Sequence, residues 1–223
     1  MFDKTKFTYN EETHQGFYEN ALVPSVTQLI GVLYPLNENI KEETLKKAAT
    51  RGTAIHNLVE EVNNLLIENG TLSNNEIDYY LNHETTEIRD YIYLLSAYNL
   101  KPVMAEKRVF LLDENGELIC YGHFDFVCSC NQANILFNSG DLFLMDLKTT
   151  NKFDKKKTAL QTQVYRVALE QNSGVDLNGK TYGVWLRDGN ANIYPFNYAE
   201  NSKIIELMKK LREIWNGRNW RIS

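Results

Sequence analysis

The stretch from Leu142 to Thr150 reads LFLMDLKTT, and it decides how the second half of the chain is expected to fold. A short apolar run of this length is typical of a buried β-strand. Side chains two residues apart in a strand lie on one face, so Asp146 and Lys148 are expected to point the same way while Leu147 points into the core. Such a pair is either an ion pair at the edge of a sheet or part of an active site, and this stretch alone leaves both interpretations open.

The residues around this stretch predict a domain with a central sheet. Apolar runs, turn residues and helical periodicity place strands at 103–112, 118–129, 142–149, 181–187 and 191–196, and helices at 155–171 and 202–215. Asn115 and Gly116 are expected to supply the positive φ angles of the first hairpin turn. This order of elements predicts an α/β or α+β fold with a central mixed β-sheet flanked by helices.

The N-terminal part of the chain is expected to be mostly helical. A hairpin is predicted within 7–23, followed by a helix that Ser25 caps and that ends at Leu33. Further helices are predicted at 38–49, 51–68, 73–81 and 84–98. We therefore expect all 223 residues to form one domain, with a helical part at 1–100 and a sheet core with a C-terminal helix at 101–223.

Composition and charge limit the classes of function. The net charge of −5 argues against non-specific binding of duplex DNA over a wide surface, because such binding depends on neutralising phosphates. Positive charge nevertheless gathers just after Asp146, and this cluster is either a solvated face or a phosphate-binding patch. No apolar run is long enough to span a membrane, and the N-terminus has no apolar signal segment. The three cysteines are expected to be reduced thiols in a cytoplasmic protein.

A second carboxylate, Asp125, lies in the apolar strand predicted at 118–129. Tyr121, His123 and Asp125 are expected on one face of that strand, with Gly122, Phe124 and Phe126 on the other. Taken alone, Asp125 is equally well a tolerated aspartate of an edge strand. If its strand lies beside that of Asp146, the two carboxylates repel unless a cation lies between them, and oxygen ligands favour Mg²⁺ or Mn²⁺. Glycine at position 122 indicates close approach by another group.

Two pairs of polar residues are spaced four apart on predicted helices, so each pair lies on one helix face. His56 and Glu60 border the apolar stripe of the helix at 51–68, where a histidine is more often structural than a ligand. Gly52, one turn before His56, would let another chain or a ligand approach. Gln161 and Tyr165 lie on the helix that follows Lys148, where they form either a polar helix face or part of a site.

Taken in order, these residues resemble the motif series of the PD-(D/E)XK nuclease superfamily. More narrowly, they resemble its RecB-like exonuclease branch, which includes phage nucleases and mitochondrial genome maintenance exonucleases. The segments RGTAIHNLVEE, GHFDFV, LMDLKTT and QTQVY carry the resemblance, and the segment PSVT at 24–27 adds to it. They supply Gly52 with His56, Gly122 with Asp125, Asp146 with Lys148, and Gln161 with Tyr165. The match runs over residues 7–170, and Phe124 replaces the proline that gives the superfamily its name.

The resemblance implies a restriction-endonuclease-like core and hydrolysis of phosphodiester bonds with one or two divalent ions. The implied metal ligands are His56, Asp125, Asp146 and the carbonyl of Leu147. Glu60 and Glu106 are further candidate site residues without an assigned role, and Glu106 resembles an acid often found at the start of this strand in the family. The implied catalytic residues are Asp125, Asp146, Lys148, Gln161 and Tyr165. The expected nucleic-acid-binding residues are Arg51, Lys152, Lys155, Lys156, Lys157 and Arg166. Some members of this branch hold an iron–sulfur cluster with four cysteines, so a chain with three is expected to lack one.

The expected activity is that of a Mg²⁺- or Mn²⁺-dependent DNA exonuclease that acts from single-stranded or frayed ends. The alternatives are an endonuclease of the same fold, a non-cleaving DNA-binding module, and a metal enzyme with another substrate. The intact set of His56, Asp125, Asp146 and Lys148 disfavours the non-cleaving module. Abundant Asn, Lys, Tyr and Ile indicate an AT-rich genome, so we expect the cytoplasm of a bacterial or phage-infected cell. The sequence does not name a recombination or replication protein as a partner.

Overall fold

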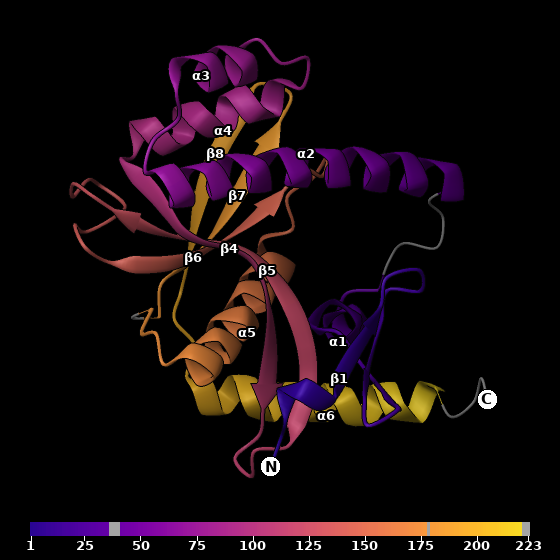
Figure 1. Cartoon of the computed structure of the whole chain (residues 1–223). Helices are drawn as coiled ribbons and strands as arrows, with labels where there is room; N and C mark the ends of the chain where they lie inside the picture. The colour runs from indigo at the N-terminus through magenta and orange to yellow at the C-terminus, as the bar shows by residue number, and fades with distance from the viewer. Residues whose placement is uncertain (36–40, 178, 220–223) are drawn as a thin grey trace.

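The computed structural model describes residues 1–35, 41–177 and 179–219, which Figure 1 shows in a mixed α/β arrangement. A short 3-10 helix, η1 (Lys4–Lys6), precedes an antiparallel sheet of β1 (Phe7–Asn10), β2 (Gln15–Tyr18) and β3 (Ala21–Val23). The central sheet contains β4 (Leu100–Leu112), β5 (Leu118–Cys130), β6 (Leu142–Lys148), β7 (Thr181–Arg187) and β8 (Asn190–Phe196). The helices are α1 (Val26–Leu33), α2 (Glu42–Asn69), α3 (Asn74–Leu81), α4 (Thr86–Ala97), α5 (Lys155–Ser173) and α6 (Asn201–Asn219).

The five strands of the central sheet lie side by side in chain order. β4, β5 and β6 are antiparallel neighbours, whereas β6 and β7 are parallel, and α5 provides the crossover that a parallel pair requires. β8 returns antiparallel to β7 after Asp188 and Gly189, whose φ angles are 50° and 78°. The predicted mixed sheet flanked by helices is therefore confirmed, and the strand of Asp125 lies beside the strand of Asp146.

Two hydrophobic clusters cover the two faces of this sheet. One contains Leu144 and packs the sheet against α1, α5 and α6. The other contains Phe143, Met145 and Leu147 and packs the opposite face against α2 and α4. Figure 1 shows the same division, with α2, α3 and α4 in the upper part of the view and α1, α5 and α6 in the lower part. Leu147 thus points into the core, as predicted, while the alternation along β6 directs Asp146 to the side of α5.

β5 changes faces at Asp125. Phe124 packs in the cluster against α5, whereas Phe126 packs in the cluster against α2. Phe124 therefore shares the face of Gly122, which lies against Tyr165 of α5, as expected, whereas the expectation that Phe126 does so was wrong. The interruption coincides with Glu106, which lies between the ladder partners of Phe124 and Phe126 on β4 and has a left-handed φ of 42°. This local turn of the backbone breaks the regular alternation of side chains along the two strands.

The first hairpin turn also differs from expectation. Gly116 has a φ of 76°, but Asn115 does not take a positive φ angle, so the turn predicted from this dipeptide was wrong in that respect. The side chain of Asp113 accepts hydrogen bonds from the backbone N–H groups of Asn115, at 2.9 Å, and Glu117, at 2.8 Å. These bonds hold a longer turn that needs the left-handed conformation only at glycine.

The helices predicted at 38–49 and 51–68 form one continuous helix, α2, so their separation was wrong; residues 38–40 lie outside the described part. Glycine in a helix costs only about 1 kcal/mol relative to alanine, and for this reason Gly52 does not end α2. Gly52 lies against Thr149, whose Oγ1 would be 3.3 Å from an added Cβ. In α1, Ser25 is the predicted cap, and its Oγ accepts from the N–H of Gln28 at 3.2 Å. None of the helices in the described residues is long and apolar enough to cross a membrane.

Candidate active site

Asp146 and Lys148 form an ion pair at the end of β6. The Nζ of Lys148 lies 2.5 Å from Oδ2 of Asp146, which confirms that the two side chains share a face. The side chain of Asp146 is 1% exposed, and the ammonium of Lys148 is the one partner that the described residues give to its Oδ2. A buried carboxylate oxygen with a single cationic neighbour is costly to bury, and it is also a suitable ligand for a hard cation.

Asp125 lies beside this pair, on β5. Its Oδ2 accepts a hydrogen bond of 2.5 Å from the backbone N–H of Leu147, the residue between Asp146 and Lys148. A charge-assisted bond of this kind fixes the carboxylate to the neighbouring strand. The sequence predicted that Asp125 and Asp146 would lie side by side, and the strand order places them so. The backbone group of Leu147 that contacts Asp125 is the N–H, while a ligand role for its carbonyl stays a prediction.

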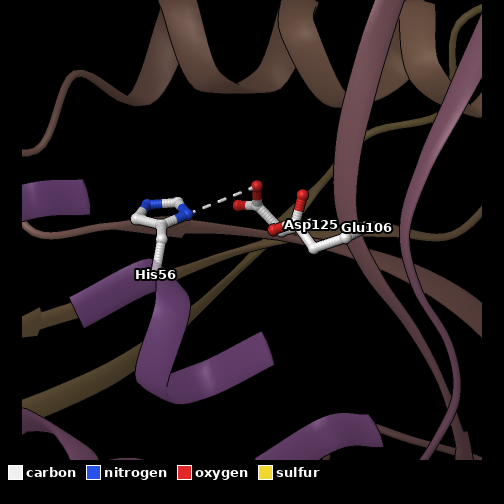
Figure 2. A group of neighbouring side chains, drawn as sticks. All are labelled: His56, Glu106 and Asp125. Carbon is white, nitrogen blue, oxygen red and sulfur yellow. Dashed lines mark ion pairs between the residues drawn. The ribbon is translucent and has the colours of Figure 1, made fainter. Parts of the chain in front are cut away.

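His56 reaches the same place from α2. Its Nδ1 lies 3.5 Å from Oδ1 of Asp125. Figure 2 shows His56, Glu106 and Asp125 converging, and one ligand atom from each lies within 4.8 Å of the others. One imidazole nitrogen with two carboxylate oxygens fits Mn²⁺ or Mg²⁺. Glu106 is the third member of this group, beside His56 and Asp125. Asp146, which the sequence predicted as a ligand, is not one of the three but lies next to Asp125.

Glu106 has a partner of its own on β5. The Nδ1 of His123 lies 2.8 Å from Oε2 of Glu106. Burial raises the pKa of Glu106; hydrogen bonding from His123 opposes that shift, and the carboxylate of Glu60 adds to it. His123 was absent from the predicted site residues. Its position two residues before Asp125 on the same strand was the signal that could have found it.

Burial and neighbouring charges shift the pKa values of the site in different directions. Burial raises the pKa of Asp146 to about 6, although the ammonium of Lys148 opposes the shift. Burial also acts to raise the pKa of Asp125, but His56 and Lys148 together hold it below its usual range. For His56, burial acts to lower the pKa and the Asp125 carboxylate raises it, with a net upward shift. Asp125 is therefore the carboxylate that stays charged most readily.

Gln161 and Tyr165 lie on the buried side of α5. The Nε2 of Gln161 donates to Oη of Tyr165 at 3.0 Å. The Tyr165 ring packs on Gly122, since a Cβ added there would lie 2.4 Å from its Cε1 atom. The close approach that Gly122 indicated is therefore that of Tyr165. Burial raises the pKa of Tyr165, and the nearby carboxylate of Asp146 raises it further, so the phenol stays protonated beside the site.

Arg51 links α2 to the residue that follows Lys148. Its guanidinium donates to the carbonyl of Thr149 at 3.2 Å and pairs with the buried carboxylate of Glu87 on α4. Arg187 of β7 donates to the same carbonyl at 3.3 Å. Arg51 was predicted to bind nucleic acid, and the structure gives it these two contacts within the chain. Sequence reasoning missed Glu87 and Arg187, because no spacing along the chain connects them to the site.

Arg51→Ala is expected to lower the free energy of unfolding by about 1–3 kcal/mol, because a buried carboxylate loses its charged partner. Glu87 is only 4% exposed, so water does not replace the guanidinium fully. Urea denaturation measures the loss. The double variant Arg51→Ala/Glu87→Gln removes the buried charge and should recover part of it. Wild-type stability of Arg51→Ala would show that the link contributes nothing.

The remaining basic residues fall into two groups. Arg166 is 1% exposed, and its guanidinium bonds to Glu170 at 2.8 Å and to Gln163 at 3.0 Å. Its predicted role in nucleic-acid binding was therefore wrong, because a buried and fully partnered guanidinium does not reach a phosphate. The other group surrounds the start of α5, where Lys152, Lys155 and Lys156 are exposed and Lys157 is half-buried.

Comparisons with known proteins were made for the whole chain. No family model matches it, and no curated protein matches it. A solved structure titled "Crystal structure of SSO0001" is similar over 72% of this chain and 74% of its own, with 13% sequence identity and a TM-score of 0.35. A likeness of this size identifies no family, so any assignment of function rests on the geometry of the site.

Proposed function

We propose that the protein is a divalent-metal-dependent nuclease that hydrolyses phosphodiester bonds in DNA. The observation that carries this proposal is the meeting of three elements, with the Asp146–Lys148 pair on β6, Asp125 on β5 and His56 on α2. An ion pair that only stabilised a sheet edge would need neither Asp125 nor His56 beside it. The order of these residues along the chain, which resembles the motif order of the RecB-like branch of the PD-(D/E)XK superfamily, also supports the proposal.

The side chains divide the chemistry between them. His56, Asp125 and Glu106 are the candidate ligands of one ion, with Asp146 next to them. When bound, the ion lowers the pKa of a coordinated water and offsets charge on the scissile phosphate. Burial acts to lower the pKa of Lys148, yet the carboxylates of Asp146 and Asp125 hold it above its usual value. A protonated Lys148 orients the attacking water or donates to the phosphate oxygen on which charge develops.

Gln161 and Tyr165 are positioning residues in this proposal. Their mutual hydrogen bond fixes the phenol, and the ring supports β5 at Gly122, three residues before Asp125. Neither side chain needs to touch the substrate for this purpose. The proposed partner is DNA, and the proposed location is the cytoplasm of a bacterial or phage-infected cell.

Linear and circular single-stranded DNA test the proposal. With Mg²⁺ or Mn²⁺ the protein is expected to shorten end-labelled linear DNA, and EDTA is expected to abolish this activity. Intact circles would support an exonuclease, whereas cut circles would assign the protein to the endonucleases. DNA binding without cleavage would favour the non-cleaving module, and Mn²⁺ binding without any nuclease activity would favour an enzyme with another substrate. Full activity in EDTA would overturn the metal mechanism.

Replacing Lys155, Lys156 and Lys157 together with serine is expected to weaken binding of single-stranded DNA and to flatten its salt dependence, by up to about 0.7 slope units per lost contact. The chain carries a net charge of −5, so phosphate contacts must come from a local patch. Cleavage at saturating DNA should stay nearly unchanged, because Lys148 and the candidate metal ligands are untouched. Titrations at several salt concentrations measure the slope.

The matched control replaces Lys203, Lys209 and Lys210 of α6 with serine. These three lysines pair with Glu200, Glu114 and Glu206, so their charge is already balanced. The control variant should keep the wild-type salt slope. An unaltered slope in the Lys155–Lys157 variant would instead identify that cluster as a solvated face.

A further inference from the structure

A cavity of about 480 Å³ opens beside Lys148, between the end of α1 and the loop that joins β6 to α5. Its lining includes Leu33, Tyr34, Pro35, Lys148, Lys152 and Lys157. The volume lies within the range of about 300–1,000 Å³ that is usual for small-ligand pockets. Because Lys148 belongs to the lining, the cavity opens directly onto the candidate active site.

The cavity has one apolar wall and one cationic wall. Leu33, Tyr34 and Pro35 form the apolar wall, and the three lysines form the other. Among the described residues Lys148 is paired with Asp146, while Lys152 and Lys157 form no ion pair. Asp154 also lines the cavity, but its Oδ1 accepts from the backbone N–H of Lys157 at 3.0 Å to cap α5. Lys152 and Lys157 give the cavity an excess of positive charge beside an apolar surface. This combination suits a ligand that carries both an anionic group and a planar ring.

The loop that carries the cationic wall is held in place from several sides. The carbonyl of Thr150 accepts from Nε1 of Trp185 at 2.8 Å, and its Oγ1 donates to the carbonyl of Lys152 at 2.9 Å. The preceding carbonyl, that of Thr149, is held by Arg51 and Arg187. A wall fixed in this way loses little conformational entropy when a ligand binds.

We propose that this cavity binds one nucleotide of a single-stranded DNA substrate, with its base against Tyr34 and its phosphates at Lys152 and Lys157. The inference rests on the proposed nuclease function and adds the place at which the strand is held. Aromatic side chains that stack bases, together with a cationic surface that follows the backbone, are the usual means of binding single strands. A base in a duplex would have to unpair and unstack before it could lie against Tyr34, so the site is expected to prefer unpaired nucleotides next to Lys148.

Oligonucleotides that each lack one base test the proposal together with a Tyr34 variant. Fluorescence anisotropy measures the binding of end-labelled oligothymidylates in EDTA, so that cleavage does not interfere. At one position, loss of the base is expected to weaken binding by about 5- to 100-fold, and Tyr34→Ala should weaken binding of the intact strand by a similar factor. On the strand that lacks this base, Tyr34→Ala and wild type should bind equally, because both changes remove the same contact.

Four further variants separate a lost contact with the ligand from a loss of folding. Tyr34→Phe keeps the ring and should bind as the wild type does. Tyr79→Ala removes a tyrosine of α3 that is 56% exposed and lies outside the cavity, so it is a control for the loss of a tyrosine elsewhere. Leu33 is 47% exposed, and Leu33→Glu places a carboxylate on the apolar wall that should repel the phosphates, whereas Leu33→Gln should have a smaller effect.

The outcomes separate the two proposals. If intact single strands bind and are cut, but neither the Tyr34 and Leu33 variants nor any missing base changes binding, the cavity holds no nucleotide. The inference then fails while the nuclease proposal stands. If the wild-type protein neither binds nor cuts single strands with any metal, both fail together.

Discussion

Lys148→Ala is expected to bind DNA about as well as the wild type and to cleave it at least about a hundredfold more slowly. The ammonium of Lys148 is paired with Asp146 at 2.5 Å, so its charge is largely balanced and adds little to binding in the ground state. Its effect should come in the transition state, where negative charge develops on the phosphate. Loss of a group used only there lowers kcat and leaves KM unchanged. Single-turnover cleavage at saturating DNA measures the difference.

Two companion variants sharpen this test. Lys148→Met keeps the length and apolar stem of the side chain without its charge, so it should be as slow as Lys148→Ala while disturbing the packing less. Lys148→Arg should rescue poorly, because a planar guanidinium does not take the place of a compact ammonium. Cleavage within a few-fold of wild type in Lys148→Ala would reduce the Asp146–Lys148 pair to a structural ion pair. The nuclease proposal would then lose its central residue.

Asp125→Asn is expected to lower Mn²⁺ affinity by about a hundredfold or more and to abolish cleavage. Mutating a residue that only hydrogen-bonds to a metal ligand already lowers metal affinity or activity by about 10–100-fold. Asp125 stands at the centre of the candidate ligand group, next to both His56 and Glu106. An asparagine at this position can still accept the hydrogen bond from the Leu147 N–H, so the strands should stay paired. Calorimetric titration with Mn²⁺ measures the affinity, and wild-type affinity would remove Asp125 from the ligands.

His56→Ala separates a ligand from a structural histidine in the same experiment. When His56 is removed, Asp125 keeps its hydrogen bond from the Leu147 N–H and the nearby charge of Lys148, so the loss should cost the metal-free protein little stability. A ligand stabilises the folded state by mass action when it binds only that state. Without Mn²⁺, the melting temperature of the variant should therefore be close to that of the wild type. Adding Mn²⁺ should raise it by less than it raises that of the wild type. A core histidine would give the opposite result, with a lower melting temperature and normal Mn²⁺ binding. Asn57→Ala, at the exposed neighbouring position, is the control.

Asp146→Asn should also lose Mn²⁺ affinity and activity while the fold survives. Burial raises the pKa of Asp146 to about 6, which means that burial disfavours its charged form. Replacing this carboxylate with a neutral amide should therefore cost the metal-free protein little free energy of unfolding. The same titration measures it, and unchanged Mn²⁺ affinity would show that Asp146 only pairs with Lys148.

Local chemistry made much of the fold predictable. Ser25 was recognised as a helix cap because capping is a local interaction. It needs only a side-chain oxygen that accepts a hydrogen bond from the backbone N–H three residues later. The strands predicted at 181–187 and 191–196 were confirmed as a hairpin, and Asp188 and Gly189 take the positive φ angles of the turn between them. The break predicted between 49 and 51 was wrong: α2 runs through it, and Gly52 costs a helix only about 1 kcal/mol relative to alanine.

The sequence by itself determined that Asp146 and Lys148 share a face and that Leu147 enters the core. Both follow from the two-residue period of a strand, which is a property of a short segment. The sequence left it conditional that the strand of Asp125 lies beside that of Asp146, and the tertiary structure decided it. Only the tertiary structure decided that Glu106 joins His56 and Asp125, that Arg51 holds the Thr149 carbonyl, and that Arg166 is buried. These outcomes depend on the left-handed backbone at Glu106 and on contacts between residues far apart in the chain, which no local pattern encodes.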